Sequence, residues 1–238
     1  STRGRIDDLG DMDVFAAKET IDAQGMVALP GLIGLVDPAV AQKILAGEGA
    51  ENYLRQGYST LILPHSLRAE KTLRETIAGL RQRDLPLNLG FVVSLSELAA
   101  FPVAEQATFL GDALFDGALA VVRNDTVAEQ LHPLTHRIVS WLNRRQIIEN
   151  EFLANKSWPE LFAEKIFHST HRRAEAFGLH ERGQIRIGDF ADLVFYRCSS
   201  TNKLECEQTP ELMLVNGRIA FSAGAQPVSL GGGTVLVR

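Results

Sequence analysis

Two pairs of histidines have a spacing that metal sites use. His132 and His136 are four positions apart in a stretch of helical periodicity, which places both imidazoles on one side of a helix. No glutamate stands between them, as it does in the metalloprotease motif, and no third ligand is evident nearby, so a surface pair is favoured over a zinc site. His168 and His171 are three apart, and the two arginines that follow them would repel a cation.

The two cysteines, Cys198 and Cys206, are too few for a disulfide framework and lack the flanking ligands of a zinc knuckle. We therefore predict two reduced thiols. The N-terminal residues carry no signal-peptide pattern, and no apolar run approaches the ~20 residues of a membrane span. A cytoplasmic protein without a membrane partner is expected.

Composition limits the class of protein. With 238 residues, of which 45% are hydrophobic, the chain can bury a sizeable core, as one large domain or two smaller ones. The net charge is −5 and the 24 basic residues are scattered, so no nucleic-acid partner is expected.

Strand and helix patterns alternate through the first half of the chain. Apolar runs bounded by glycine or proline predict buried strands at residues 57–66, 86–93 and 117–123. Helical spacing predicts helices at 67–83 and 102–110, and a loosely helical stretch at 40–55 that Gly47 and Gly49 interrupt. This alternation predicts right-handed βαβ units in a parallel sheet.

The two ends of the chain have the patterns of a smaller β-layer. Short strands are predicted at residues 5–10 and 19–23, and a strand that begins near Ala191 and Asp192. Residues 212–221 predict a hairpin, because an Asn-Gly turn at Asn216 and Gly217 stands between two apolar runs. Residues 127–177 between these parts have a helical pattern.

Three parts of the sequence resemble sequence motifs of the amidohydrolase superfamily, in particular of its dihydroorotase and hydantoinase branch. Residues 24–38, which end in Pro-Gly-Leu-Ile-Gly-Leu-Val-Asp-Pro, resemble the entry into the barrel of that family. Residues 57–66 are similar to its second-strand phrase, and residues 171–195 together with the Val-Asn-Gly-Arg at 215–218 are similar to its closing phrases.

The resemblance implies an α/β fold: a partial or degenerate TIM-like (β/α) barrel with a small β-sandwich formed by the N- and C-terminal segments. Residues 1–30 and 180–238 would form the sandwich, and residues 31–179 an incomplete barrel. A full barrel uses roughly 250 residues. The second half is therefore deleted, rewritten beyond recognition or outside this sequence, and an open barrel would need a partner to cover its apolar edge.

The sequence departs from the family at the positions that carry its chemistry. The family places His-x-His, two metal ligands, directly after the first barrel strand, where this chain has Leu35, Val36, Asp37 and Pro38. A bridging lysine of the fourth strand is also absent, and Arg123 near that position cannot form a carbamate.

His65 stands where the family has an asparagine that touches substrate, although a strand-end histidine facing solvent is the favoured interpretation. We predict Asp37, His65 and Arg123 at the mouth of the ancestral pocket, because ligands of such barrels bind at the carboxyl ends of strands. We predict no catalytic residue and no metal ligand.

Two functions follow from the resemblance. The first is a non-catalytic homologue with a structural or partner-binding role, as a homo-oligomer or with a protein such as aspartate transcarbamoylase, and without a cofactor. The alternative is an active zinc-dependent hydrolase of a cyclic amide, of the dihydroorotase type known from pyrimidine biosynthesis or of the hydantoinase type. Its ligands would lie in segments missing from this sequence, and a small cyclic amide would be its ligand.

Overall fold

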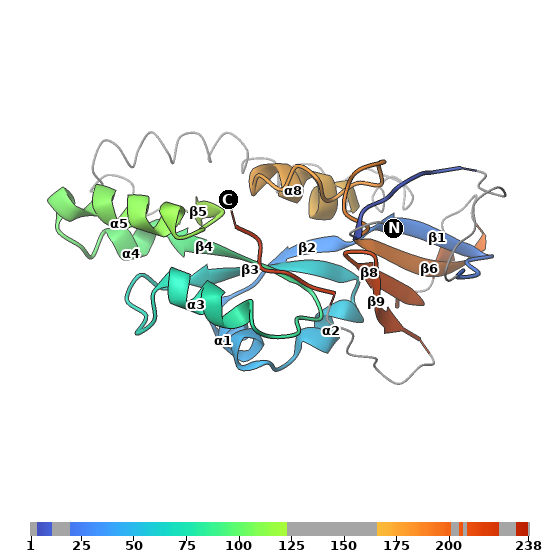
Figure 1. Cartoon of the computed structure of the whole chain (residues 1–238), viewed down its shortest axis with the longest axis horizontal. Coiled ribbons are helices and arrows are strands. Elements are labelled where there is room, and N and C mark those ends of the chain that lie inside the picture. Colours follow the sequence, from blue (N-terminus) through green and yellow to red (C-terminus); the bar gives the residue numbers. More distant parts are fainter. Residues whose placement is uncertain are drawn as a thin grey trace.

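The computed structural model describes residues 4–10, 20–122, 166–200, 205–206, 209–223 and 232–237, which form two separate sheets (Figure 1). A parallel sheet has the order β2-β3-β4-β5, formed by β2 (Leu32–Leu35), β3 (Tyr58–His65), β4 (Asn88–Ser94) and β5 (Ala120–Val122). An antiparallel sheet has the order β1-β6-β8-β9, formed by β1 (Met26–Pro30), β6 (Leu193–Ser200), β8 (Leu212–Val215) and β9 (Arg218–Ser222), with β7 (Glu205–Cys206) paired to β6.

The described helices connect the parallel strands or follow the last of them. They are α1 (Pro38–Ala46), α2 (Ala50–Leu54), α3 (Leu73–Leu80), α4 (Leu95–Leu98), α5 (Val103–Phe115), the π-helix η3 (His168–Arg172) and α8 (Arg173–Ala176). Helix α3 is shorter than the predicted 67–83, because Thr72 forms a capping box with Glu75 and starts the helix there. Within the described residues, no helix combines the length and the apolar character that crossing a bilayer requires.

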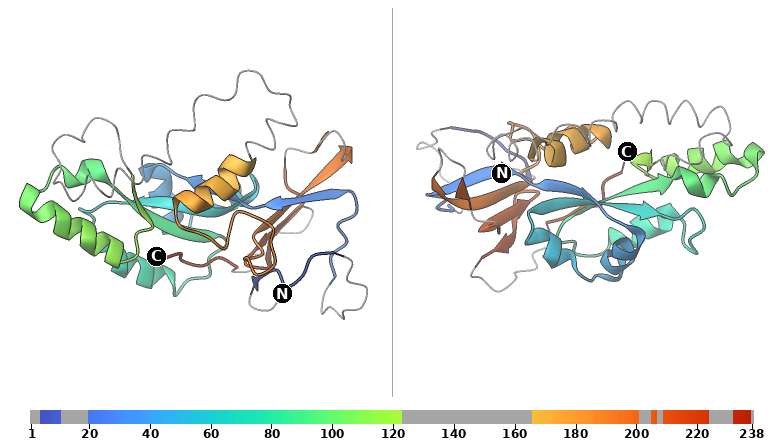
Figure 2. Two further views of the ribbon diagram at one scale, coloured as in Figure 1. Left: turned by 90° about the horizontal axis from the view of Figure 1, so that it is seen from above. Right: turned by 180° about the vertical axis from the view of Figure 1, so that it is seen from behind.

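The parallel strands follow one another in chain order, and their connecting helices lie on one face. Leu61, Leu63, Phe91 and Val93 pack in one cluster with buried residues of α1, α3 and α5. The alternate side chains of the same strands, such as Ile62 and Val92, form a second cluster that Ala174 of α8 and Leu236 cover. Figures 1 and 2 show α1 and α3 on one side of this sheet and α8 on the other.

Consecutive strand order with all connecting helices on one face is the arrangement of a barrel, whereas a doubly wound sheet reverses its order and has connecting helices on both faces. The curled four-stranded sheet is therefore part of a TIM-like barrel beside a separate antiparallel sheet. The predicted fold class is confirmed.

The antiparallel sheet joins distant parts of the chain. Residues 26–30 of β1 pair with residues 193–197 of β6. The predicted hairpin forms β8 and β9, with Asn216 (φ 49°) and Gly217 (φ 72°) both left-handed, as a type I′ turn requires. The predicted strands at 5–10 and 19–23 are wrong over the described residues: Arg5 makes only an isolated bridge to Phe190, and residues 20–23 form no strand. The proposed domain boundaries stay a prediction.

The prediction of reduced thiols is wrong. Cys198 is disulfide-bonded, and the residue opposite it in the β6–β7 ladder is Cys206, the other of the two cysteines. Antiparallel pairing turns a separation of eight positions into direct neighbours across two strands. The spacing of the two cysteines alone does not show that the chain reverses direction between them.

A buried polar network lies where the two sheets meet. Asp192 accepts hydrogen bonds from Arg182 Nη1 and Asn88 Nδ2 at one carboxylate oxygen and from the Asn216 backbone N–H at the other. Asn216 Nδ2 in turn donates to Asn88 Oδ1 over 2.7 Å. The Arg182 and Asp192 side chains are 4% and 3% exposed, so an ion pair and two amides tie together β4, the β8–β9 turn and the residues before β6 in a buried network.

Candidate functional site

The carboxyl ends of the parallel strands are the expected site, because side chains from several strands meet at one rim there. In the described residues β2 ends at Leu35, β3 at His65, β4 at Ser94 and β5 at Val122. The site is therefore built from these residues and from the loops that follow them.

Asp37 after β2 starts a helix. Its Oδ1 accepts a hydrogen bond from the Val40 backbone N–H over 2.9 Å, and Pro38 occupies the first helical position, where a missing N–H costs nothing. The side chain is exposed. The Asp-Pro pair at the end of the first barrel strand therefore acts as a helix N-cap in this structure.

His65 at the end of β3 is buried, with 8% of its surface exposed, so the expectation of a solvent-facing histidine is wrong. Its ring meets the ring of Phe91 edge to face, with centroids 6.2 Å apart. Phe91 belongs to the cluster that packs on the helices, so the imidazole points toward the helical layer. Burial lowers the pKa of His65, against the opposing effect of the Glu97 and Asp116 charges, and this favours a neutral ring.

Glu97 of α4 is a residue of this rim that the sequence did not reveal. Its Oε2 accepts hydrogen bonds from Ser66 Oγ over 3.0 Å and from the Leu67 backbone N–H over 2.7 Å. The carboxylate thus ties the loop after β3 to α4, which directly follows β4. No local pattern could have shown this, because the two partners are about 30 positions apart.

The Asp37 side chain caps a helix, whereas the His65 ring packs on an aromatic ring. The third predicted pocket residue, Arg123, lies outside the described residues, and so do His132 and His136. Their common role at a pocket mouth stays a prediction.

The other histidine pair lies in the π-helix. His168 and His171 flank the ring of Phe167, with centroid distances of 6.1 and 5.2 Å, and His171 Nε2 lies 3.6 Å from Glu175 Oε1. Over the part of the chain that the structure describes, no three His, Cys, Asp or Glu side chains cluster as a metal site would require.

The donor set at the described strand ends does not fit a zinc ion. Zinc sites use three or four His, Cys or carboxylate ligands around one point. The rim offers Leu35 and Val36, a carboxylate of Asp37 already bound to a backbone N–H, and one imidazole of His65 turned to the helices. The Glu97 carboxylate is also at the rim, but its Oε2 already accepts hydrogen bonds from Ser66 and Leu67.

The comparisons with known proteins agree with this architecture. No protein-family model matches the sequence, and no curated protein matches it. Among solved structures, D-aminoacylase is similar with a TM-score of 0.68 and 14% identity, over 99% of this chain and 94% of that chain. N-acyl-D-glutamate deacylase from Bordetella bronchiseptica is similar with a TM-score of 0.62 and 13% identity, over 99% and 94%. D-hydantoinase is similar with a TM-score of 0.53 and 11% identity, over 98% and 93%.

These likenesses show a shared barrel fold. More particularly, the chain shares the fold of D-aminoacylase, whose structure is described as defining a subset of amidohydrolases, so the resemblance found in the sequence is confirmed at the level of the fold. Identities of 11 to 14% show the fold and leave the activity to the chemistry of the site.

Proposed function

We propose that this chain is a non-catalytic relative of the amidohydrolases with a structural or partner-binding role. The observation that carries the proposal is the chemistry at the end of β2. Two apolar side chains, a helix-capping carboxylate and a proline stand where the family has its first two metal ligands. Without such ligands a water molecule keeps a pKa far above 7 and cannot attack an amide efficiently.

The neighbouring strand ends support the same conclusion. A neutral imidazole can bind zinc, but the ring of His65 packs on Phe91 in the helix-facing cluster, away from the opposite face. That opposite face carries Ile62 and Val92 under Ala174 and Leu236. Over the described residues, the packing on this face is mainly apolar, and the Arg173 guanidinium beside it donates to the Ile33 carbonyl over 2.7 Å.

Exposed apolar residues support the binding role. Leu35 is 44% exposed at the end of β2, which is an edge strand of the described sheet, and Phe115 is 81% exposed at the end of α5. An exposed apolar side chain on an edge strand, as Leu35 is, is typical of surfaces that a partner covers. The partner is a second copy of this chain or another protein, with aspartate transcarbamoylase as the candidate that the family suggests.

The alternative is an active metal-dependent hydrolase of a cyclic amide. It is favoured by the fold shared with D-hydantoinase and with a deacylase whose structure was determined with zinc. In that case the ligands come from residues outside the described parts.

Metal analysis and turnover separate the two. The purified chain is assayed for zinc by mass spectrometry and for hydrolysis of dihydroorotate, hydantoin and an N-acyl-D-amino acid, before and after incubation with zinc. We expect no stoichiometric metal and no turnover. Stoichiometric zinc together with hydrolysis would refute the proposal, and light scattering would report the expected assembly.

A further inference from the structure

The turn between β8 and β9 contains a pair of residues that can react with each other. Asn216 is the only asparagine of the chain that is followed by a glycine. In such a pair the backbone nitrogen of the glycine can attack the side-chain amide of the asparagine, because no Cβ hinders its approach. Asn216 and Gly217 therefore form a candidate site of spontaneous modification, and the folded structure decides whether the attack is open to them.

Hydrogen bonds hold the side-chain amide of Asn216 in one orientation. Its Nδ2 donates to Asn88 Oδ1 and to the Gly232 carbonyl, over 2.7 Å each. Its Oδ1 accepts a hydrogen bond from Arg182 Nη2 over 2.9 Å. A carbonyl only accepts and a guanidinium only donates, so these partners distinguish the nitrogen of the amide from its oxygen.

The attacking nitrogen is held as well. The Gly217 backbone N–H donates to the Ala191 carbonyl over 3.0 Å. Ring closure requires this nitrogen to lose its proton and to reach Cγ of Asn216, so the hydrogen bonds of both groups must open first. Four bonds, each worth a factor of about 2–10 in the opening equilibrium, lower the reactive population more than about tenfold.

We propose that Asn216 is a deamidation site whose reaction the buried network between the two sheets controls. When the turn opens, the Gly217 nitrogen forms a bond to Cγ of Asn216 and the bond from Cγ to Nδ2 breaks. Ammonia leaves with the proton of the Gly217 amide, and a succinimide ring remains. One water molecule then opens the ring at either carbonyl to give aspartate or isoaspartate, and water is the only co-reactant.

The product does not fit the network. A carboxylate at this position has no N–H, so one of its oxygens faces the Gly232 carbonyl and Asn88 Oδ1. It also adds a negative charge beside Asp192, whose Oδ1 accepts the backbone N–H of the same residue over 2.8 Å. Isoaspartate in addition lengthens the backbone of a two-residue turn that sets the hairpin register. Deamidation therefore weakens the junction of the two sheets.

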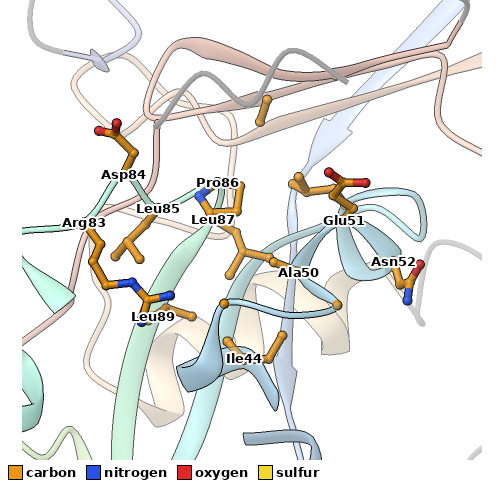
Figure 3. Close-up of a pocket in the computed structure, with 14 residues that line it drawn as sticks. Ile44, Ala50, Glu51, Asn52, Arg83, Asp84, Leu85, Pro86, Leu87 and Leu89 are labelled. Atoms are coloured by element: carbon orange, nitrogen blue, oxygen red, sulfur yellow. The ribbon is translucent and has the colours of Figure 1, made fainter. Parts of the chain in front are cut away.

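The comparison residue is Asn52. Figure 3 shows it on α2, at the rim of a pocket of about 390 Å³. Asn52 is exposed, but the bulky Tyr53 follows it, so the backbone nitrogen that would attack is hindered. A difference between Asn216 and Asn52 in the unfolded chain measures the chemistry of the Asn-Gly pair, and a difference between folded and unfolded chain measures the control by the network.

The rates are measured on the full chain at mildly alkaline pH, where the Gly217 nitrogen loses its proton more readily. Mass spectrometry of peptides follows the replacement of the amide by a carboxyl group, and water enriched in heavy oxygen labels the product. In urea we expect Asn216 to react faster than Asn52. In the folded chain Asn216 is expected to react at least about tenfold more slowly than in urea.

Variants test the control by the network. Arg182→Met removes the donor to Asn216 Oδ1 and is expected to raise the rate in the folded chain about tenfold. Arg197→Met, which alters a partly exposed ion pair outside the network, should leave the rate unchanged. If Arg182→Met does not fold, the unaltered chain in urea below its unfolding transition gives the same test, because the rate should rise as the turn opens.

Asn216→Asp tests the effect of the product. Its thermal midpoint is expected to fall by about 5 °C or more below that of Asn52→Asp, the exposed control, and a chain that no longer folds meets the same expectation. Three results would overturn the proposal: an Asn216 that reacts as fast in the folded chain as in urea, an Asn216 that does not react in urea, or an Asn216→Asp protein as stable as Asn52→Asp.

Discussion

Replacing Arg182 by methionine tests whether the buried ion pair holds the two sheets together. The change keeps an unbranched but shorter and uncharged side chain, and it leaves the Asp192 carboxylate with only the neutral donors of Asn88 and Asn216. Removing one partner of a buried pair costs about 3–5 kcal/mol, because the remaining charge stays out of water. The change also removes the guanidinium from above the Phe190 ring, 4.0 Å from its centroid.

We expect Arg182→Met to lower the free energy of unfolding by about 4 kcal/mol, against a typical total of about 5–15 kcal/mol. At about 2–4 °C per kcal/mol for a chain of this size, the thermal midpoint falls by roughly 8–16 °C. Urea unfolding followed by circular dichroism measures the first quantity, and a thermal scan measures the second.

The control is Arg197→Met. Its Nη2 lies 3.5 Å from Glu211 Oε1, and both side chains are partly exposed, so the cost is below about 1 kcal/mol. Adding Asp192→Asn to Arg182→Met removes the unpaired charge, so the double variant is expected to lose less than the sum of the single losses. An Arg182→Met protein as stable as the Arg197→Met control would refute the reasoning.

Three further predictions follow from single contacts. Burial lowers the pKa of His65 below 6.5, so the folded state takes up this proton at a lower pH than the unfolded state does. The free energy of unfolding therefore falls as the pH falls from 6.5 toward the lower folded pKa. Thermal scans should show a weaker dependence of stability on pH in this range for His65→Asn. Cys198→Ala opens a loop that the Cys198–Cys206 pairing closes over nine residues, and the free energy of unfolding should fall by about 2–3 kcal/mol in urea, whereas an effect near zero would contradict a formed disulfide. Asp37→Ala removes the α1 cap and should cost about 1 kcal/mol by urea unfolding, while Asp37→Asn, which keeps an acceptor, should cost less; equal losses would contradict the capping role.

Much of the fold follows from local patterns. The apolar runs predicted the parallel strands, and the glycine interruption predicted the break between α1 and α2. Asn216 and Gly217 predicted the hairpin because few other pairs adopt two left-handed conformations in succession. The predicted strands at 5–10 and 19–23 failed over the described residues, since short polar segments have no apolar period to fix them.

The candidate site, too, was predicted only in part from the sequence. The sequence by itself determined which groups stand at the strand ends, namely Leu35, Val36 and Asp37 in place of two histidines, because residue type needs no coordinates. Only the tertiary structure decided that His65 is buried against Phe91, that Glu97 holds the β3 loop and that Cys198 is bonded. The physical reason is that sheet register and helix packing choose the face of each strand-end side chain, and these depend on contacts between residues far apart in the chain.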